Sequence, residues 1–145
     1  MVGKQARRTS TINRGTAGVS KLVEGYCRQM DRWPRSWMGS EEDIPAGEEL
    51  VTCFRPFVEH LVCCDLSPRT IQKHVDNLWA LGGEIIRHLH QDPPLRRMAM
   101  EQIIDERIDE EGGPLVYAHE SEETLQRSVD STCRKLYRFR QQTPH

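Results

Sequence analysis

Apolar residues recur at intervals of three and four positions along most of this chain, the spacing that places side chains on one face of an α-helix. The clearest run comprises Ile71, Val75, Leu78, Gly82, Ile85 and Leu89, and Trp79, Leu81 and Ile86 widen it. This run follows Ser67 and Pro68, which are favoured at the N-cap and the first helical position. The pattern predicts a long amphipathic helix that begins at the proline.

The same periodicity predicts four further helices. One runs from residue 20 toward Pro34, one covers 47–64, one begins at Asp92 and ends in the acidic run 105–111, and the last begins at Ser121. We expect residues 33–39, which hold two tryptophans, to form a loop that packs on the core. Residues 112–114 should break the chain, and 115–117 should form a short extended stretch at most.

Two positions conflict with helical structure. Pro56 falls inside the 47–64 helix, so this helix should kink or restart there. Gly82 and Gly83 lie inside the 68–90 helix, where each glycine costs about 1 kcal/mol relative to alanine. A kink or the close approach of another helix would offset this cost, and we expect close packing.

Five helices with short connections and almost no strand signal predict a compact all-α bundle. A length of 145 residues accommodates one domain, which we place at 17–141. Residues 1–16 contain no acidic residue and no apolar period, so they are interpreted as a disordered basic arm. The longest stretch free of charged residues is 112–119, which is too short to span a membrane, and no apolar signal core is evident. We therefore expect a cytoplasmic chain without a membrane span.

The charge is distributed unevenly along the sequence. Eight basic and two acidic residues give 1–40 a net charge of +6, whereas 12 basic and 20 acidic residues give 41–145 a net charge of −8. A basic arm on an acidic body indicates an anionic partner such as nucleic acid, and it is also compatible with a solvated tail. Arg7 and Arg8 are the candidate DNA contacts within the arm.

The cysteines are five in number, Cys27, Cys53, Cys63, Cys64 and Cys133, which favours reduced thiols over a disulfide framework. His60, Cys63 and Cys64 have the spacing of metal ligands on one helix. A structural zinc site needs a fourth ligand, however, and no second pair is evident. We therefore interpret them as buried thiols beside a surface histidine, and no metal or cofactor is predicted.

Sequence signals for catalysis are absent. The chain contains no Gly-x-Ser-x-Gly turn and no phosphate-binding glycine-rich loop. The acidic run 105–111 could hold a cation, but it lacks the spacing of an ion-binding loop and fits a solvated helix end better. We expect a protein that is not an enzyme.

The start of the helix at 68–90 is the strongest candidate for binding an anion. Ser67, Arg69, Thr70, Lys73 and His74 supply hydroxyls and cations beside a helix N-terminus, where free N–H groups attract phosphates. Arg69 and Lys73 are four residues apart and therefore share a face outside the apolar stripe. The alternative is an ordinary exposed polar face.

Residues 57–61 (FVEHL) and 66–71 (LSPRTI), with the helix that follows, resemble the N-terminal core-binding domain of tyrosine recombinases of the phage-integrase type. The resemblance covers 47–90 and implies a small SAM-like helical bundle that clasps DNA through phosphate contacts. The blocks 77–87 and 131–136 instead resemble a small bacterial protein family to which no activity is attached. The recombinase catalytic domain has no counterpart after residue 90, since no His-x-x-Arg precedes Tyr137.

Two functions follow as hypotheses. The first is a non-catalytic DNA-binding or recombination-accessory module. The second is a protein-interaction or adaptor domain, with self-association as a homodimer, that uses an apolar surface around Trp33, Trp37 and Phe57 and binds no nucleic acid.

Overall fold

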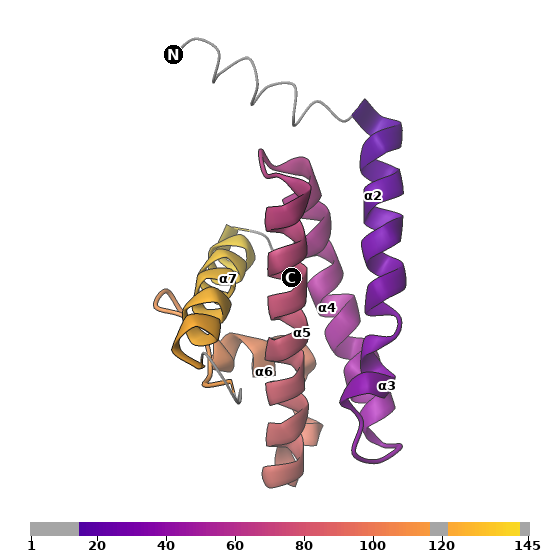
Figure 1. The fold of residues 1–145 in the computed structure, drawn as a ribbon. Helices are drawn as coiled ribbons and strands as arrows, with labels where there is room; N and C mark the ends of the chain where they lie inside the picture. Colours follow the sequence, from indigo (N-terminus) through magenta and orange to yellow (C-terminus); the bar gives the residue numbers. More distant parts are fainter. Residues whose placement is uncertain (1–14, 117–121, 143–145) are drawn as a thin grey trace.

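The computed structural model describes residues 15–116 and 122–142, which are mostly helical (Figure 1). The elements in chain order are α2 (Gly15–Met30), α3 (Trp33–Trp37), α4 (Asp43–Cys63), α5 (Pro68–Gln91), the 3₁₀ helix η1 (Pro93–Arg97), α6 (Met100–Arg107) and α7 (Glu122–Gln142). The helices form a compact bundle, so the predicted all-α class is confirmed. None of the described helices combines the length and apolar character that crossing a bilayer requires.

Helix α5 lies at the centre of the bundle, between α4 and α7 (Figure 1). Helix α2 packs against α4, and α6 contacts both α4 and α5. The largest fully buried side chains come mainly from α4 and α5: Leu50, Phe54, Phe57, Leu61, Ile71, Leu78, Leu81, Ile85, Ile86 and Leu89. Burying a side chain of this size contributes roughly 1.5–3 kcal/mol, so the α4–α5 contact is the main source of stability.

The tryptophan-rich segment after α2 is helical, so the predicted loop at 33–39 is wrong for its first five residues. Pro34 lies in the first turn of α3, where backbone N–H groups have no acceptor within the helix, so a proline without an N–H is tolerated. The expected packing on the core is confirmed, because Trp33 is buried and its ring lies 5.6 Å from that of Trp37. Helix α2 ends at Met30, ahead of the proline as predicted.

A single helix, α4, runs through Pro56 and begins four residues earlier than predicted. It is therefore not divided at the proline. Pro56 lies on the exposed side of α4, and Thr52, whose carbonyl loses the usual helical donor, is also exposed. Water can donate a hydrogen bond to the Thr52 carbonyl there, which explains why the helix tolerates a proline at this position.

Helix α5 begins as predicted, with Ser67 as its N-cap and Pro68 in its first turn. Its glycines permit the close packing that was expected, although the group that approaches is an aromatic side chain. A Cβ atom on Gly82 would lie 2.3 Å from Cζ2 of Trp37. Trp79, predicted to belong to the buried stripe, is instead 45% exposed and donates its indole N–H to Ser36 Oγ.

The segment after α5 is not one helix, which corrects the prediction of a continuous helix from Asp92. It forms η1 and α6, separated by extended backbone at Met98 and Ala99. Pro93 disfavours the α conformation at the preceding residue, and that residue, Asp92, has the non-helical angles φ −138° and ψ 76°. A short 3₁₀ turn is the result.

The chain turns at residues 109–112, as the glycines at 112 and 113 predicted. Asp109 and Gly112 form an isolated bridge, and Gly112 has a φ of +148°. A Cβ atom at Gly112 would also lie 2.6 Å from Oδ1 of Asp130 on α7. Residues 113–116 carry no regular structure, while Tyr117 and the expected N-cap Ser121 lie outside the described residues.

The predicted boundary of the basic arm is partly wrong, because residues 15 and 16 already belong to α2. Residues 1–14, with Arg7 and Arg8, lie outside the described residues, so those two candidate contacts cannot be placed.

A buried carboxylate joins the start of α4 to the end of α5. Asp43 is fully buried, and it accepts hydrogen bonds from Gly39 N at 2.7 Å, His90 Nε2 at 2.6 Å and Arg96 Nη2 at 2.8 Å. Burial acts to raise the pKa of Asp43, but the bonds from Arg96, the backbone and His90 outweigh it and hold that pKa well below its ordinary value. We call Asp43, His90 and Arg96 the Asp43 corner.

Candidate nucleic-acid interface

The N-terminus of α5 satisfies most of its own hydrogen bonds. Ser67 Oγ accepts from Thr70 N at 3.2 Å and donates to Thr70 Oγ1 at 3.1 Å, while Ile71 N donates to the Ser67 carbonyl at 3.0 Å. The two hydroxyls are thus engaged within the cap, and Pro68 has no N–H to offer. Ser67 and Thr70 therefore serve the helix start, and the exposed cations Arg69 and Lys73 carry the capacity to bind an anion.

His74 is not on the exposed face, which corrects its assignment to the exposed anion-binding surface. Its side chain is buried, and Nδ1 lies 2.6 Å from Thr132 Oγ1 on α7. Asn77 donates to the same hydroxyl at 2.9 Å, so α5 and α7 share a buried polar network. Burial, followed by the charges of Lys73 and Lys135, lowers the pKa of His74 to about 4.

Helix α7 contributes two further cations to the side of the molecule where α5 begins. Lys135 on α7 and Lys73 on α5 act on the same buried imidazole, so both ammonium groups lie near the α5–α7 contact. Arg138 follows Lys135 by three residues and lines the same hollow as Leu66, which precedes the α5 N-cap. We call Arg69, Lys73, Lys135 and Arg138 the basic face.

Within the described residues, none of the four cations of the basic face forms an ion pair. Two other basic residues near the end of α7 behave differently. Arg140 is buried and binds Asp105 Oδ1 and Glu101 Oε1, each at 2.8 Å. Arg134 donates to the carbonyl of Glu111 at 3.3 Å. The four cations of the basic face are therefore free to compensate an external anion.

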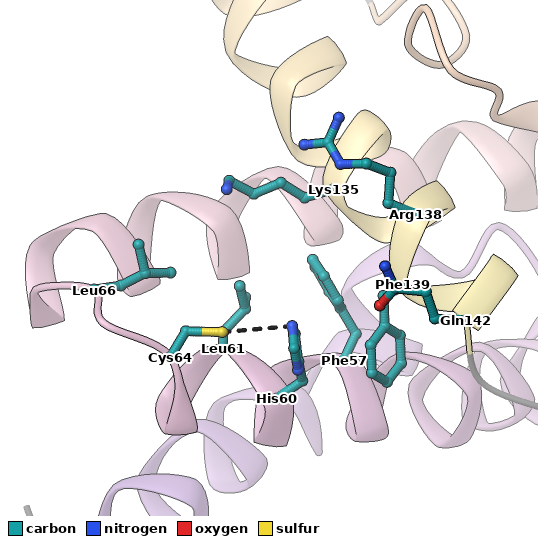
Figure 2. Close-up of a pocket in the computed structure, with 9 residues that line it drawn as sticks. All are labelled: Phe57, His60, Leu61, Cys64, Leu66, Lys135, Arg138, Phe139 and Gln142. Carbon is teal, nitrogen blue, oxygen red and sulfur yellow. Dashed lines mark hydrogen bonds between the residues drawn. The ribbon is translucent and has the colours of Figure 1, made fainter.

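A hollow of about 190 Å³ lies beside the basic face, between the end of α4, the 64–66 connection and α7 (Figure 2). It is lined by Phe57, His60, Leu61, Cys64, Leu66, Lys135, Arg138, Phe139 and Gln142. The two cations lie along one side of the hollow and the aromatic rings on another (Figure 2). This combination of flat apolar groups and cations suits an anion that carries an apolar part.

The cluster of His60, Cys63 and Cys64 is only partly assembled. Cys64 Sγ lies 3.4 Å from His60 Nε2, whereas Cys63 is exposed and points to no shared centre. The prediction of buried thiols is therefore wrong, because Cys63 is exposed at the last residue of α4 and Cys64 is only partly buried. In the ranges 15–116 and 122–142 no group of three or more His, Cys, Asp or Glu side chains could hold a metal ion.

The predicted apolar interaction surface is not formed. Trp33 and Phe57 are buried in the core, and Trp37 is partly buried against α5, where its indole N–H donates to the Trp79 carbonyl at 2.9 Å. The large apolar side chains that do reach solvent among the described residues are Met38, Trp79 and Leu115. Burial of these large aromatic rings in the core is favoured over their exposure to solvent.

The acidic run at 105–111 is used within the fold. Asp105 binds Arg140, and Asp109 Oδ1 accepts from the N–H groups of Glu111 and Gly112 at 2.8 and 3.1 Å. These contacts support the interpretation as a helix end and turn instead of a cation site.

Comparison with known proteins gives no match: no protein-family model, no curated protein and no solved structure is similar to this chain.

Proposed function

We propose that this protein is a non-catalytic module that binds the phosphate backbone of DNA through the basic face. The observation that supports this best is a set of four cations on two packed helices that form no ion pair among the described residues. Arg69 and Lys73 come from α5, and Lys135 and Arg138 come from α7. A phosphate backbone presents negative charges at regular spacing and would compensate all four cations together.

The electrostatic state of His74 supports the proposal from inside the fold. Burial is the main cause of its lowered pKa, and the charges of Lys73 and Lys135 add to it, so both lysines contribute positive potential at the α5–α7 contact. Such a potential costs stability in the free protein, because like charges repel each other. An anionic ligand on the basic face would relieve this cost.

The resemblance of residues 47–90 to the recombinase core-binding domain agrees with this role. In that family a helical bundle clasps DNA without supplying the nucleophile, and the turn at 66–71 is part of the resemblance. The net charge of −8 over residues 41–145 restricts contact to a local patch, since most of the surface would repel DNA. The module would then act as a DNA-binding or recombination-accessory protein.

Fluorescence anisotropy with a labelled duplex tests the proposal. Four phosphate contacts predict that the logarithm of the binding constant falls with the logarithm of salt concentration with a slope of about −3.6. The double variant Arg69→Glu/Lys73→Glu should weaken binding and reduce the slope by about 2. Lys135→Glu/Arg138→Glu should have a similar effect, although the two pairs come from different helices.

Two controls keep the result specific. Lys21→Glu/Arg35→Glu makes the same charge change at exposed positions on α2 and α3, so its binding should stay close to that of the unaltered chain. Arg7→Ala/Arg8→Ala separates the contribution of the arm. Equal losses of DNA affinity in the Lys21/Arg35 control and in the basic-face variants would contradict the proposal. Complete loss of binding in the Arg7→Ala/Arg8→Ala variant would contradict it as well.

A second function, binding to a protein partner or to another copy, is favoured by one observation. Trp79 is 45% exposed and Met38 is 38% exposed, and both lie beside Ser36, to which the Trp79 indole is bonded. Exposed tryptophan is enriched at interfaces. Sedimentation velocity over a range of concentrations tests self-association, and an unchanged monomeric value for both the unaltered chain and Trp79→Ser would exclude a homodimer through this surface.

A further inference from the structure

Among the described residues, Cys64 differs from the other four cysteines in having an imidazole within hydrogen-bond distance. Its Sγ lies 3.4 Å from His60 Nε2. Cys53 donates to Glu101, and burial followed by that carboxylate raises the pKa of Cys53 to about 12. Burial likewise raises the pKa of Cys133 to about 12, so both thiols are unreactive near neutral pH.

The surroundings of Cys64 form a small site. The exposed His60 ring lies beside two phenyl rings, with centroids 6.4 Å from Phe57 and 4.9 Å from Phe139. The sulfur borders the hollow of about 190 Å³ that Lys135 and Arg138 line (Figure 2). A thiol, a base and two cations therefore meet around one cavity.

We propose that Cys64 is a site of reversible modification by anionic low-molecular-weight disulfides, with His60 as the base and with Lys135 and Arg138 as partners for the carboxylates of the reagent. The thiol of Cys64 transfers its proton to His60 Nε2, and the resulting thiolate attacks one sulfur of the disulfide. A bond forms between this sulfur and Cys64 Sγ while the reagent's S–S bond breaks. The departing thiolate keeps the electron pair and takes the proton from the imidazolium, so one thiol and one disulfide give one mixed disulfide and one thiol.

The neighbouring cysteine provides an internal comparison. Cys63 is exposed, whereas Cys64 is only partly exposed. Accessibility alone predicts that Cys63 reacts first, but the proposal predicts that Cys64 reacts first. Both thiols belong to the same turn of chain, so differences in local stability do not separate them.

The test treats the full-length chain at neutral pH with oxidised glutathione and follows adduct formation by intact-mass spectrometry. Because the two thiols are adjacent, the variants Cys63→Ser and Cys64→Ser assign the adduct. We expect Cys63→Ser to react as fast as the unaltered chain and Cys64→Ser to lose the fast phase. His60→Phe keeps the ring packing without a base and should slow the reaction by about tenfold or more.

The role of the cations is tested with 2-hydroxyethyl disulfide, which carries no charge. The unaltered chain should prefer oxidised glutathione, and Lys135→Gln/Arg138→Gln should lose that preference while retaining reaction with the neutral reagent. Faster reaction at Cys63, or an unchanged rate in His60→Phe, would overturn the proposal. Equal rates with both reagents in the unaltered chain would overturn the role of the cations and thereby the assignment to anionic disulfides.

Discussion

The Asp43 corner and the basic face each bring charged side chains together from distant parts of the sequence, but they differ in balance. At the corner, the buried carboxylate of Asp43 meets Arg96, His90 and two backbone N–H groups. At the basic face, cations from α5 and α7 surround a buried neutral imidazole and have no acidic partner within the described residues. Balanced charge at the corner joins α4, α5 and η1, whereas the cations of the basic face form no ion pair among the described residues.

Removing the carboxylate at the corner should have the largest effect on stability. Asp43→Ala leaves Arg96 and the N–H of Gly39 without their partner, so we expect a loss of about 3–4 kcal/mol in the free energy of unfolding. Urea denaturation followed by circular dichroism measures it. Glu42→Gln is the matched control, because Glu42 is exposed and 3.5 Å from Arg96 and should change stability by less than about 0.5 kcal/mol. Equal effects of both changes would contradict the importance of the corner.

Acidification should destabilise the basic face, where His74 is buried, before it affects the Asp43 corner. The pKa of His74 is about 4 in the folded protein and 6.5 ordinarily, so between these values the unfolded chain binds a proton that the folded chain does not. Stability is complete above pH 6.5 and should fall by up to about 3 kcal/mol as the pH approaches 4. Asp43 loses its contribution only below its ordinary pKa of 3.8 and does not interfere in this range.

Urea midpoints measured from pH 7 to pH 4 for the unaltered chain and for His74→Gln isolate this effect. The pKa of His88 is also lowered by burial, so the comparison of the two chains, and not the slope of one, carries the result. Parallel curves would show that His74 does not titrate as described.

The Trp37 ring packs on two glycines of α5, Gly82 and Gly83, and substitutions at these positions test how close that contact is. In Gly82→Ala the new Cβ would lie 2.3 Å from the ring, and displacement of Trp37 should cost about 1–2 kcal/mol after the gain in helix propensity. In Gly83→Ala the nearest ring atom is 3.4 Å away, so this control should be neutral or stabilising by up to about 1 kcal/mol. Thermal unfolding distinguishes them, and equal signs for both variants would contradict the close contact.

The smallest effect on stability is expected at the basic face itself. Lys73→Gln or Lys135→Gln removes a cation that has no partner to lose, so the free energy of unfolding should change by no more than about 0.5 kcal/mol. Below pH 6.5 the direction should be a slight gain, since each lysine adds to the effect of burial in lowering the pKa of His74. A clear loss of stability in chemical denaturation would mean that the lysines serve the fold.

The helical architecture could be predicted because it depends on local pattern. Ser67 and Pro68 defined the start of α5, and the apolar period defined its buried face. His74 was misplaced although it lies three residues after Ile71 and four before Leu78, a spacing that puts it beside the buried stripe. Its polar side chain suggested solvent, and its partner Thr132 could be found only from the tertiary structure.

The composition of the site was predicted only in part for the same reason. Arg69 and Lys73 were identified from their position at a helix start, but Lys135 and Arg138 lie more than 60 residues later. Their spacing of three marked a shared face of α7, but nothing in the local sequence indicates that this face adjoins α5. Nor could the pattern show that Asp43 is buried, because the groups that balance its charge come from residues 39, 90 and 96.

The division of the basic face between two helices couples its existence to the docking of α7. When α7 separates from α5, the bond between His74 and Thr132 breaks and half of the cations leave the surface. Any ligand that holds both halves therefore binds only the docked form and shifts the opening equilibrium toward it by mass action. Amide hydrogen exchange along α7 would then slow as the ligand saturates the basic face. The protection of α7 amides would therefore report the fraction of protein that has ligand bound.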